Sequence, residues 1–284
     1  MVTIRNIVAL LLVLLPLTAP AGSGLDRAGT ASTSLFAQSA AQSLEHDFPS
    51  PDLSFLLVDA TTGELLAARW DHAERAIPMG SLAKPFAALA YGEKHSFRYP
   101  IHTCRGSASG CWRLRGHGSV NLTSAIAYSC NSYFRSLTAG LHPSDVLEVT
   151  TRFGLDAPNR DASAAALAGL GPGWLISPLH MAHAYLELLH QKRNPAVAQI
   201  LSGMSQSAEQ GTGRGVDDAL FPSRALVKTG TAPCTHARHA PGDGFTVALF
   251  PADDPKVLLL ICVHGVPGAE AAKTAGSMLR KIGN

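Results

Sequence analysis

The placement of the strand-like runs constrains the fold more than any other feature of this sequence, because they lie near the two ends of the chain. Two runs come first, joined by the turn Thr61-Thr62-Gly63, and three more follow residue 213. The five runs cover residues 53–59, 64–68, 225–231, 245–250 and 257–263. Strands on either side of a helical stretch predict one antiparallel sheet flanked by helices, with an inserted all-helical lobe. This is an α/β fold of the α+β type, and we expect its active site between the two lobes.

Apolar residues recur at helical spacing through most of the remaining chain. The predicted helices cover residues 34–48, 81–91, 122–139, 146–153, 179–190, 196–204 and 271–282. The last one places Ala272, Ala275 and Leu279 on one face, so it should lie on the sheet. Residues 95–118 show no such spacing, and we expect them to be irregular.

The composition fits a globular domain and excludes some partners. The chain has 284 residues, of which 46% are hydrophobic and 15% charged, so it can bury a full core. Its formal net charge of +2 is too small to indicate a nucleic-acid partner, and no cluster of lysine and arginine stands out. We therefore expect no DNA or RNA binding.

The amino terminus has the pattern of an export signal. Arg5 precedes an apolar run over residues 7–17, and small residues follow it. This predicts a signal peptide over residues 1–21, with an uncleaved anchor as the alternative, although the run is short for a full membrane span. A linker over 22–33 and one domain over 34–284 should follow. The expected location is the periplasm or the outer face of the cytoplasmic membrane.

Five cysteines leave a disulfide and a metal site open as alternatives. Disulfides are common in exported proteins, and the preferred pair is Cys104 with Cys111, on either side of a Gly/Ser-rich turn. The pairing of Cys130, Cys234 and Cys262 stays open. Cysteine and histidine at short spacing are also zinc ligand types. The two candidate sets are His102, Cys104, Cys111 and His117, and Cys234, His236 and His239. Neither set matches a strong zinc pattern, so we expect no cofactor.

A serine and a lysine three residues apart form the first chemical motif. Ser81 and Lys84 lie where a loop enters a predicted helix, and Pro85 suits its first turn. On one helical face their side chains can meet. A buried lysine with a lowered pKa can take the proton of a serine hydroxyl, and unpaired N–H groups at a helix start can stabilise an oxyanion. A helix cap beside a solvated lysine is the alternative interpretation.

Two further motifs strengthen the first. Ser129-Cys130-Asn131 lies in the helical middle, and Lys228-Thr229-Gly230-Thr231 lies in a predicted strand. In this order, the three motifs resemble the transpeptidase domain of the penicillin-binding proteins, within the penicillin-recognising serine enzymes. Longer phrases are similar to the class B members in particular, at residues 59–64, 116–122, 129–134 and 177–182. The resemblance covers roughly residues 34–284.

The resemblance implies a role for each motif residue. Ser81 would be the nucleophile and Lys84, desolvated beside Lys228, its base. Ser129 would relay a proton to the departing nitrogen, and Asn131 would hold Lys84 and the substrate amide.

The third motif would bind the substrate. Thr229, Gly230 and Thr231 would line the peptide, the two threonine hydroxyls would bind its terminal carboxylate, and the N–H groups of Ser81 and Thr231 would form the oxyanion hole. The implied partners are D-Ala-D-Ala stem peptides of peptidoglycan, with β-lactam antibiotics as inhibitors and envelope partners unknown. The implied activity is a D,D-transpeptidase with a Ser81 acyl-enzyme.

Other functions remain as alternatives. A class A β-lactamase would carry a Glu-x-x-Leu-Asn phrase between Asn131 and Lys228, and there is none. A class D enzyme usually has an aliphatic residue in place of Asn131. A D,D-carboxypeptidase uses the same motifs with water as the acceptor. The non-enzyme alternative is a β-lactam sensor or a cell-wall scaffold, since we expect neither the amino-terminal pedestal of class B proteins nor a glycosyltransferase domain within these 284 residues.

Overall fold

The computed structural model describes residues 35–234 and 242–283, which belong to one compact unit, Thr33–Asn284. The expected signal peptide over residues 1–21 and the linker over 22–33 lie outside the described residues. So do His236 and His239 of the second candidate metal set. Within the described ranges, no helix has both the length and the apolar character needed to cross a membrane.

A five-stranded antiparallel sheet is the centre of the fold, in the order β2-β1-β7-β6-β5. Its strands are β1 (Leu53–Asp59), β2 (Leu65–Arg69), β5 (Leu226–Ala232), β6 (Asp243–Phe250) and β7 (Val257–Val263). The predicted antiparallel sheet of strands from both ends of the chain is thus confirmed. The last strand in chain order, β7, lies in the middle and joins the early hairpin to the late strands.

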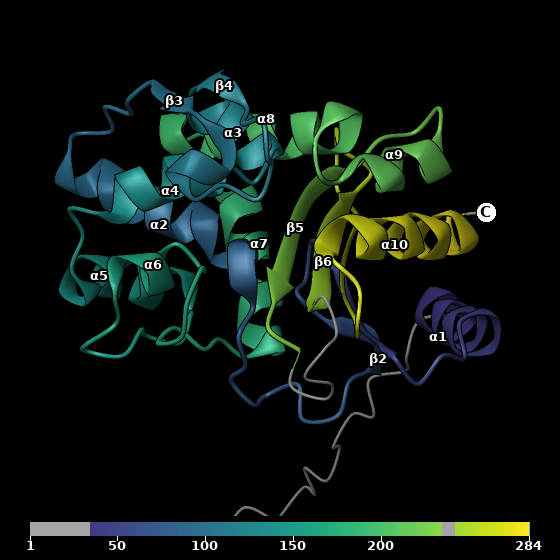
Figure 1. Cartoon of the computed structure of the whole chain (residues 1–284). Coiled ribbons are helices and arrows are strands. Elements are labelled where there is room, and N and C mark those ends of the chain that lie inside the picture. Colours follow the sequence, from purple (N-terminus) through teal and green to yellow (C-terminus); the bar gives the residue numbers. More distant parts are fainter. Residues whose placement is uncertain (1–34, 235–241, 284) are drawn as a thin grey trace, which may run out of the picture. The chain divides into compact units, whose positions relative to one another are not determined.

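Helices cover both faces of this sheet (Figure 1). On one face lie α1 (Leu35–Asp47) and α10 (Gly268–Ile282), whose buried side chains meet alternate residues of the strands. On the other face lies α7 (Pro178–His190), which contacts β1 and β7. Both faces are buried, so the central strands read as continuous apolar runs instead of alternating ones.

The helical lobe lies beside β5, to the left of the sheet in Figure 1. Its first helix, α2 (Lys84–Lys94), is buried almost all round and packs on α4 (Asn131–Thr138) and α5 (Pro143–Phe153). The elements after the hairpin are the 3₁₀ turn η1 (Gly80–Ala83), α2 (Lys84–Lys94), β3 (His102–Cys104), η2 (Gly106–Ser109), β4 (Gly118–Val120), α3 (Leu122–Ala127), α4 (Asn131–Thr138), α5 (Pro143–Phe153), α6 (Ala164–Leu167), α8 (Pro195–Gln210) and α9 (Arg214–Leu220).

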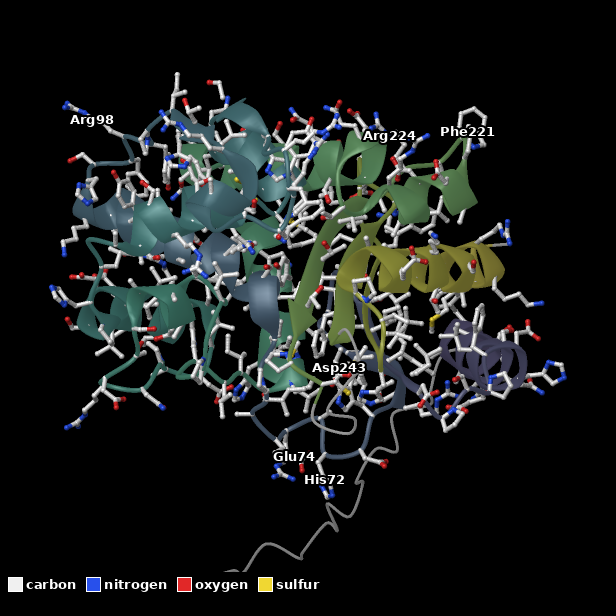
Figure 2. The ribbon with its side chains drawn as sticks, in the orientation of Figure 1. His72, Glu74, Arg98, Phe221, Arg224 and Asp243 are labelled. Atoms are coloured by element: carbon white, nitrogen blue, oxygen red, sulfur yellow. The ribbon has the colours of Figure 1, made fainter. Side chains whose placement is uncertain are left out.

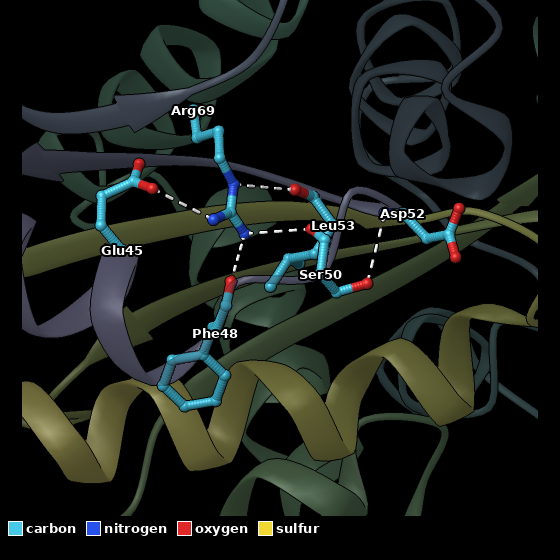
Figure 3. A network of polar contacts seen from close by, with 6 residues as sticks. All are labelled: Glu45, Phe48, Ser50, Asp52, Leu53 and Arg69. Atoms are coloured by element: carbon cyan, nitrogen blue, oxygen red, sulfur yellow. Dashed lines mark hydrogen bonds and ion pairs between the residues drawn. The ribbon is translucent and has the colours of Figure 1, made fainter.

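Arg69 fixes the start of the domain to the sheet (Figure 3). From the end of β2, its Nε donates to the carbonyl of Leu53 at 3.2 Å, and its Nη2 donates to the carbonyls of Phe48 and Ser50. Nη1 also pairs with Glu45 of α1 at 3.2 Å. One guanidinium therefore supplies donors to the loop between α1 and β1 and to the first residue of β1.

Arg224 has a similar role before β5. It forms ion pairs with Glu209 of α8 and Asp217 of α9, and Figure 2 shows it near the outer end of α9, close to Phe221. The backbone N–H of Ala225 also donates to Asp217, at 3.1 Å. The two helices thereby set where β5 begins.

Three sequence expectations need correction. The single helix predicted over 122–139 is two helices, because the chain breaks at Tyr128–Cys130 between α3 and α4. The irregular stretch 95–118 contains η2 and leads into the two-stranded β3–β4 ladder. The helix predicted from Ser81 begins as η1, and the α-helix itself starts at Lys84.

Candidate active site

Ser81 lies in a single 3₁₀ turn, η1, directly before α2. Its side chain is buried, with 8% of the residue exposed, and Lys84 is completely buried as the first residue of α2. The backbone N–H of Lys84 donates to the carbonyl of Ser81. Side chains three residues apart are eclipsed in a 3₁₀ turn, so the serine and the lysine share one face. The shared face of the turn agrees with the sequence expectation, whereas the roles of Ser81 as nucleophile and Lys84 as its base stay predictions.

Close backbone contacts hold this turn against β5. A Cβ atom at Gly80, where φ is +56°, would lie 2.3 Å from the carbonyl oxygen of Thr231. A Cβ atom at Gly169 would lie 2.1 Å from the carbonyl oxygen of Gly80. From α7, the Tyr185 hydroxyl donates to the carbonyl of Leu82 at 3.0 Å. The turn is therefore fixed from three sides, and only glycine fits at two of the contacts.

Lys84 makes three hydrogen bonds with the second motif. Its Nζ donates to Asn131 Oδ1 at 2.6 Å, to the carbonyl oxygen of Ser129 at 2.9 Å and to Ser129 Oγ at 3.3 Å. The ammonium also lies 5.3 Å from the centre of the Phe134 ring. The predicted contact between Asn131 and Lys84 is present.

Lys228 approaches the same hydroxyl from the sheet. Its Nζ donates to Ser129 Oγ at 3.0 Å and to the carbonyl of Thr229 at 2.6 Å, and the residue is completely buried. Ser129 Oγ thus lies within hydrogen-bond distance of both lysine amines. A hydroxyl in this position can pass a proton, because it both donates and accepts.

Burial of two cations so close together favours their neutral forms. Burial lowers the pKa of Lys84 to about 7. The nearby thiols of Cys130 and Cys111 raise this pKa, and the charge of Arg135 lowers it further. Burial, and after it the charge of Lys84, lower the pKa of Lys228 well below its usual value. A neutral amine that can accept a proton is therefore available near neutral pH.

The second motif lies on a strained turn. Ser129 has a φ of +48°, an uncommon conformation for a residue with a side chain, and Cys130 is extended with φ −66° and ψ 106° as the N-cap of α4. These two residues end α3 and start α4. The helical spacing around them is continuous, which is why the sequence predicted one helix and missed the break.

The third motif lies on β5, at the edge of the sheet. A Cβ atom at Gly230 would be 2.7 Å from the carbonyl oxygen of Met79, so the strand passes directly against the residues before Ser81. Thr229 Oγ1 donates to Thr212 Oγ1 at 2.6 Å, and Thr231 Oγ1 accepts from the N–H of Gly268 at 2.9 Å. Sequence reasoning did not select Thr212 or Gly268, because neither belongs to a motif.

The cysteine predictions are partly wrong. All five cysteines are free thiols, so the expected Cys104–Cys111 disulfide is absent. The turn between β3 and β4 brings the thiols of Cys104 and Cys111 to the same ring nitrogen of His117. The thiol of Cys111 also contacts that of Cys130 at the start of α4. His102 is not part of this group, because its Nε2 lies 2.7 Å from Ser132 Oγ.

A cavity of about 960 Å³ adjoins the segments that carry the first and third motifs, since Pro78 and Pro233 belong to its lining. It is lined by Trp70, Phe245 and His264 among others, and neither Ser81 nor the two lysines contribute to it. The site is therefore defined by the polar groups gathered between β5 and the helical lobe.

A buried serine–lysine turn, a second serine shared by two buried lysines and a Lys-Thr-Gly edge strand define the class of penicillin-recognising serine enzymes. Residues 53–283 match the family described as the penicillin binding protein transpeptidase domain. The chain belongs to this family.

Solved structures of the family share the fold. The chain is 19% identical to Pseudomonas aeruginosa PBP2, solved in complex with WCK 5153, with a TM-score of 0.69 over 87% of this chain and 75% of that one. It is 17% identical to the transpeptidase domain of Burkholderia pseudomallei penicillin-binding protein 3, with a TM-score of 0.66 over 87% and 91%. It is 18% identical to Helicobacter pylori PBP2, solved in complex with MreC, with a TM-score of 0.67 over 85% of this chain and 62% of that one. No curated protein sequence matches the chain.

Proposed function

We propose that this protein is a D,D-transpeptidase that acts on D-Ala-D-Ala stem peptides of peptidoglycan through an acyl-enzyme on Ser81. The observation that carries the proposal is the Ser129 hydroxyl, which lies 3.3 Å from the Lys84 amine and 3.0 Å from the Lys228 amine. With Asn131 also bonded to Lys84, the three motifs form one proton-transfer network next to the turn that holds Ser81.

The first half-reaction transfers the peptide to the enzyme. Ser81 Oγ attacks the carbonyl carbon of the penultimate D-alanine, and the neutral Lys84 amine takes the hydroxyl proton. The bond to the terminal D-alanine breaks, and its nitrogen receives a proton through Ser129. The N–H groups of Ser81 and Thr231 stabilise the oxyanion that forms between these events.

The second half-reaction returns Ser81 to its starting state. An amine of a second stem peptide attacks the ester carbon and loses a proton to the same network, and the Ser81 oxygen regains a proton as the ester bond breaks. The outcome is a new peptide bond between two stems. Water in place of the amine gives carboxypeptidase activity, so the acceptor distinguishes the two functions.

The edge position of β5 supports recognition of an extended peptide. Among the described strands, β5 pairs with β6 on one side only, and the helical lobe lies beside β5 in Figure 1. The turn η1, which contains Ser81, also contacts β5. A substrate strand added along this edge would bring its carbonyl to the nucleophile turn. The proposed location is the periplasm or the outer face of the cytoplasmic membrane, where such peptides occur.

Acylation by a penicillin tests the proposal directly. Purified protein should gain the mass of one penicillin, and peptide mapping should place it on Ser81. A Ser81→Ala variant should gain nothing, while Ser277→Ala, a change on α10 far along the chain, should be labelled like the wild type. Absence of an adduct, or an adduct that survives in Ser81→Ala, would contradict the proposed nucleophile.

The lifetime of the adduct and a peptide assay separate the remaining functions. An adduct that persists for many minutes supports a penicillin-binding protein, whereas catalytic loss of the drug indicates a β-lactamase. Incubation with a pentapeptide stem and a D-amino acid then gives an exchanged product for a transpeptidase. A trimmed product alone indicates a carboxypeptidase and contradicts the finer proposal.

A further inference from the structure

Three cysteines and one histidine form a cluster that the acyl-transfer mechanism does not use. Cys104 ends β3, Cys111 follows η2, His117 precedes β4 and Cys130 is the N-cap of α4. One sulfur or nitrogen atom of each lies within 4.8 Å of the others, and the three cysteines are buried. Three chain segments therefore bring four soft ligand atoms to one point.

The distances within this cluster fit a tetrahedral metal ion. His117 Nδ1 lies 3.6 Å from the sulfur of Cys104 and 3.5 Å from that of Cys111, and the sulfurs of Cys111 and Cys130 are 3.9 Å apart. For tetrahedral Zn²⁺, with bonds of about 2.3 Å to sulfur and about 2.0 Å to nitrogen, sulfur and nitrogen lie about 3.5 Å apart and two sulfurs about 3.8 Å apart. A disulfide would need two sulfurs at about 2.0 Å and would leave the third thiol beside the imidazole.

The chain around the cluster is shaped for this arrangement. A Cβ atom at Gly106 would lie 2.0 Å from the carbonyl oxygen of Leu114, and one at Gly116 would lie 2.2 Å from that of Cys104. Both glycines have a positive φ, a backbone conformation that residues with a side chain rarely adopt. The turn that presents Cys104 and Cys111 is thus tightly folded on itself.

Two aromatic rings set the orientation of His117. Its ring stacks on Tyr128, with centroids 5.2 Å apart and planes at 11°, and Trp112 packs on it edge-on at 5.4 Å. Nδ1 faces the sulfurs, while Nε2 is buried and has no hydrogen-bond partner among the described residues. Nδ1 is therefore the ring nitrogen that is placed to bind a metal ion, which would leave the proton on Nε2.

We propose that Cys104, Cys111, His117 and Cys130 bind one structural zinc-type ion that fixes the second motif in place. Thiolates and imidazole select a soft divalent metal such as Zn²⁺ over Mg²⁺ or Ca²⁺. Four protein ligands fill a tetrahedral site and leave no open position for a substrate or water. The ion has a structural role and takes no part in the acyl-transfer steps.

Cys130 links this ion to the acylation network. It stands between Ser129, whose φ is +48°, and Asn131, which bonds Lys84. A metal–sulfur bond at Cys130 opposes relaxation of the strained turn, which would otherwise move the Ser129 hydroxyl away from the two lysines. Cys130 is a positioning residue in this scheme, and this second half of the inference rests on the proposed function.

Metal content tests the site without any assay of activity. The full chain, purified without chelators, should contain one equivalent of zinc by elemental mass spectrometry. Cys104→Ser, Cys111→Ser and Cys130→Ser should each lose it, whereas the matched control Cys262→Ser, another buried cysteine on β7, should keep it. Cobalt exchanged into the wild type should show the visible absorption of tetrahedral thiolate coordination. A metal-free protein that gives no such absorption after reduction and reconstitution overturns the proposal, as does a disulfide within the cluster.

Chelation of the wild type tests the positioning role even if the cysteine variants fail to fold. Removal of the metal should slow acylation by a fluorescent penicillin at least tenfold, and added Zn²⁺ should restore the rate. An unchanged rate in the metal-free protein overturns the positioning role. If loaded protein contains zinc but Ser81 is never acylated, the proposed function fails while the metal site stands.

Discussion

The two motifs that meet at the Ser129 hydroxyl are held in opposite ways. Lys228 lies on β5, which pairs with β6 from Leu226 to Ala232, so the sheet ladder fixes its backbone. Ser129 lies between two helices on a turn with a positive φ, and no ladder supports it. The strand can provide an amine in a fixed position, whereas the turn needs support from side chains: the contact of Asn131 with Lys84, and the thiol of Cys111 beside Cys130.

Removal of the shared hydroxyl should give the largest effect, because it breaks the contact between the two regions. Ser129→Ala should lower the rate of acylation by roughly 10²- to 10⁴-fold, the usual range for loss of a proton-transfer group. Ser277→Ala serves as the control, and stopped-flow labelling with fluorescent penicillin measures both. Near-normal labelling in Ser129→Ala would show that the lysines act without this hydroxyl.

The pH dependence should locate the base on the helix side of the site. Lys84, with a pKa of about 7, can accept a proton only when neutral, so protonation at low pH removes the base. The acylation rate should therefore fall about tenfold for each pH unit below about 6 and be level above about 8. Rates measured from pH 5 to 9 on wild type give the profile. A rate that first rises near pH 10 would mean that Lys84 keeps its ordinary pKa.

Gly80→Ala should test the contact that holds the nucleophile turn on the strand. The new Cβ atom would lie 2.3 Å from the carbonyl of Thr231 at a residue with φ +56°, so both strain and a backbone clash oppose it. We expect a loss of about 2 to 4 kcal/mol in the free energy of unfolding. Gly140→Ala, where nothing lies within 4 Å of the new atom, should change it by less than about 0.5 kcal/mol. Urea unfolding compares the two, and equal midpoints would contradict the close approach.

The strand side of the comparison was the easier one to predict from the sequence. β1 and β7 have the predicted bounds, Leu53–Asp59 and Val257–Val263, because short apolar runs between turn residues have few other solutions. The three motifs contained Lys84, Asn131 and Lys228, which the structure brings together with Ser129. The expectation that they act together came from the family resemblance, whereas the distances between their side chains could be obtained only from the structure.

The turn side was harder, for a physical reason. The break at Tyr128–Cys130 carries no glycine or proline, so helical spacing runs through it and local propensity gives no warning. Cys130 was also missed as a member of the thiol–imidazole group, since it follows Cys111 by 19 residues. Only tertiary packing brings the β3–β4 turn to the start of α4.

The smallest predicted effect separates the two regions with a matched pair of tryptophans. Trp112 Nε1 donates to the carbonyl of Tyr128 at 3.2 Å, next to Ser129, and Trp174 Nε1 donates to the carbonyl of Asp156 at 2.8 Å, in the segment before α7. Each Trp→Phe change removes one hydrogen bond, worth about 1 kcal/mol. Trp112→Phe should slow acylation about two- to fivefold, because it loosens the strained turn, whereas Trp174→Phe should lower thermal stability and leave the acylation rate unchanged. Equal acylation rates in the two variants would show that the turn is fixed without the indole, and that its support comes from the cysteine and histidine side chains alone.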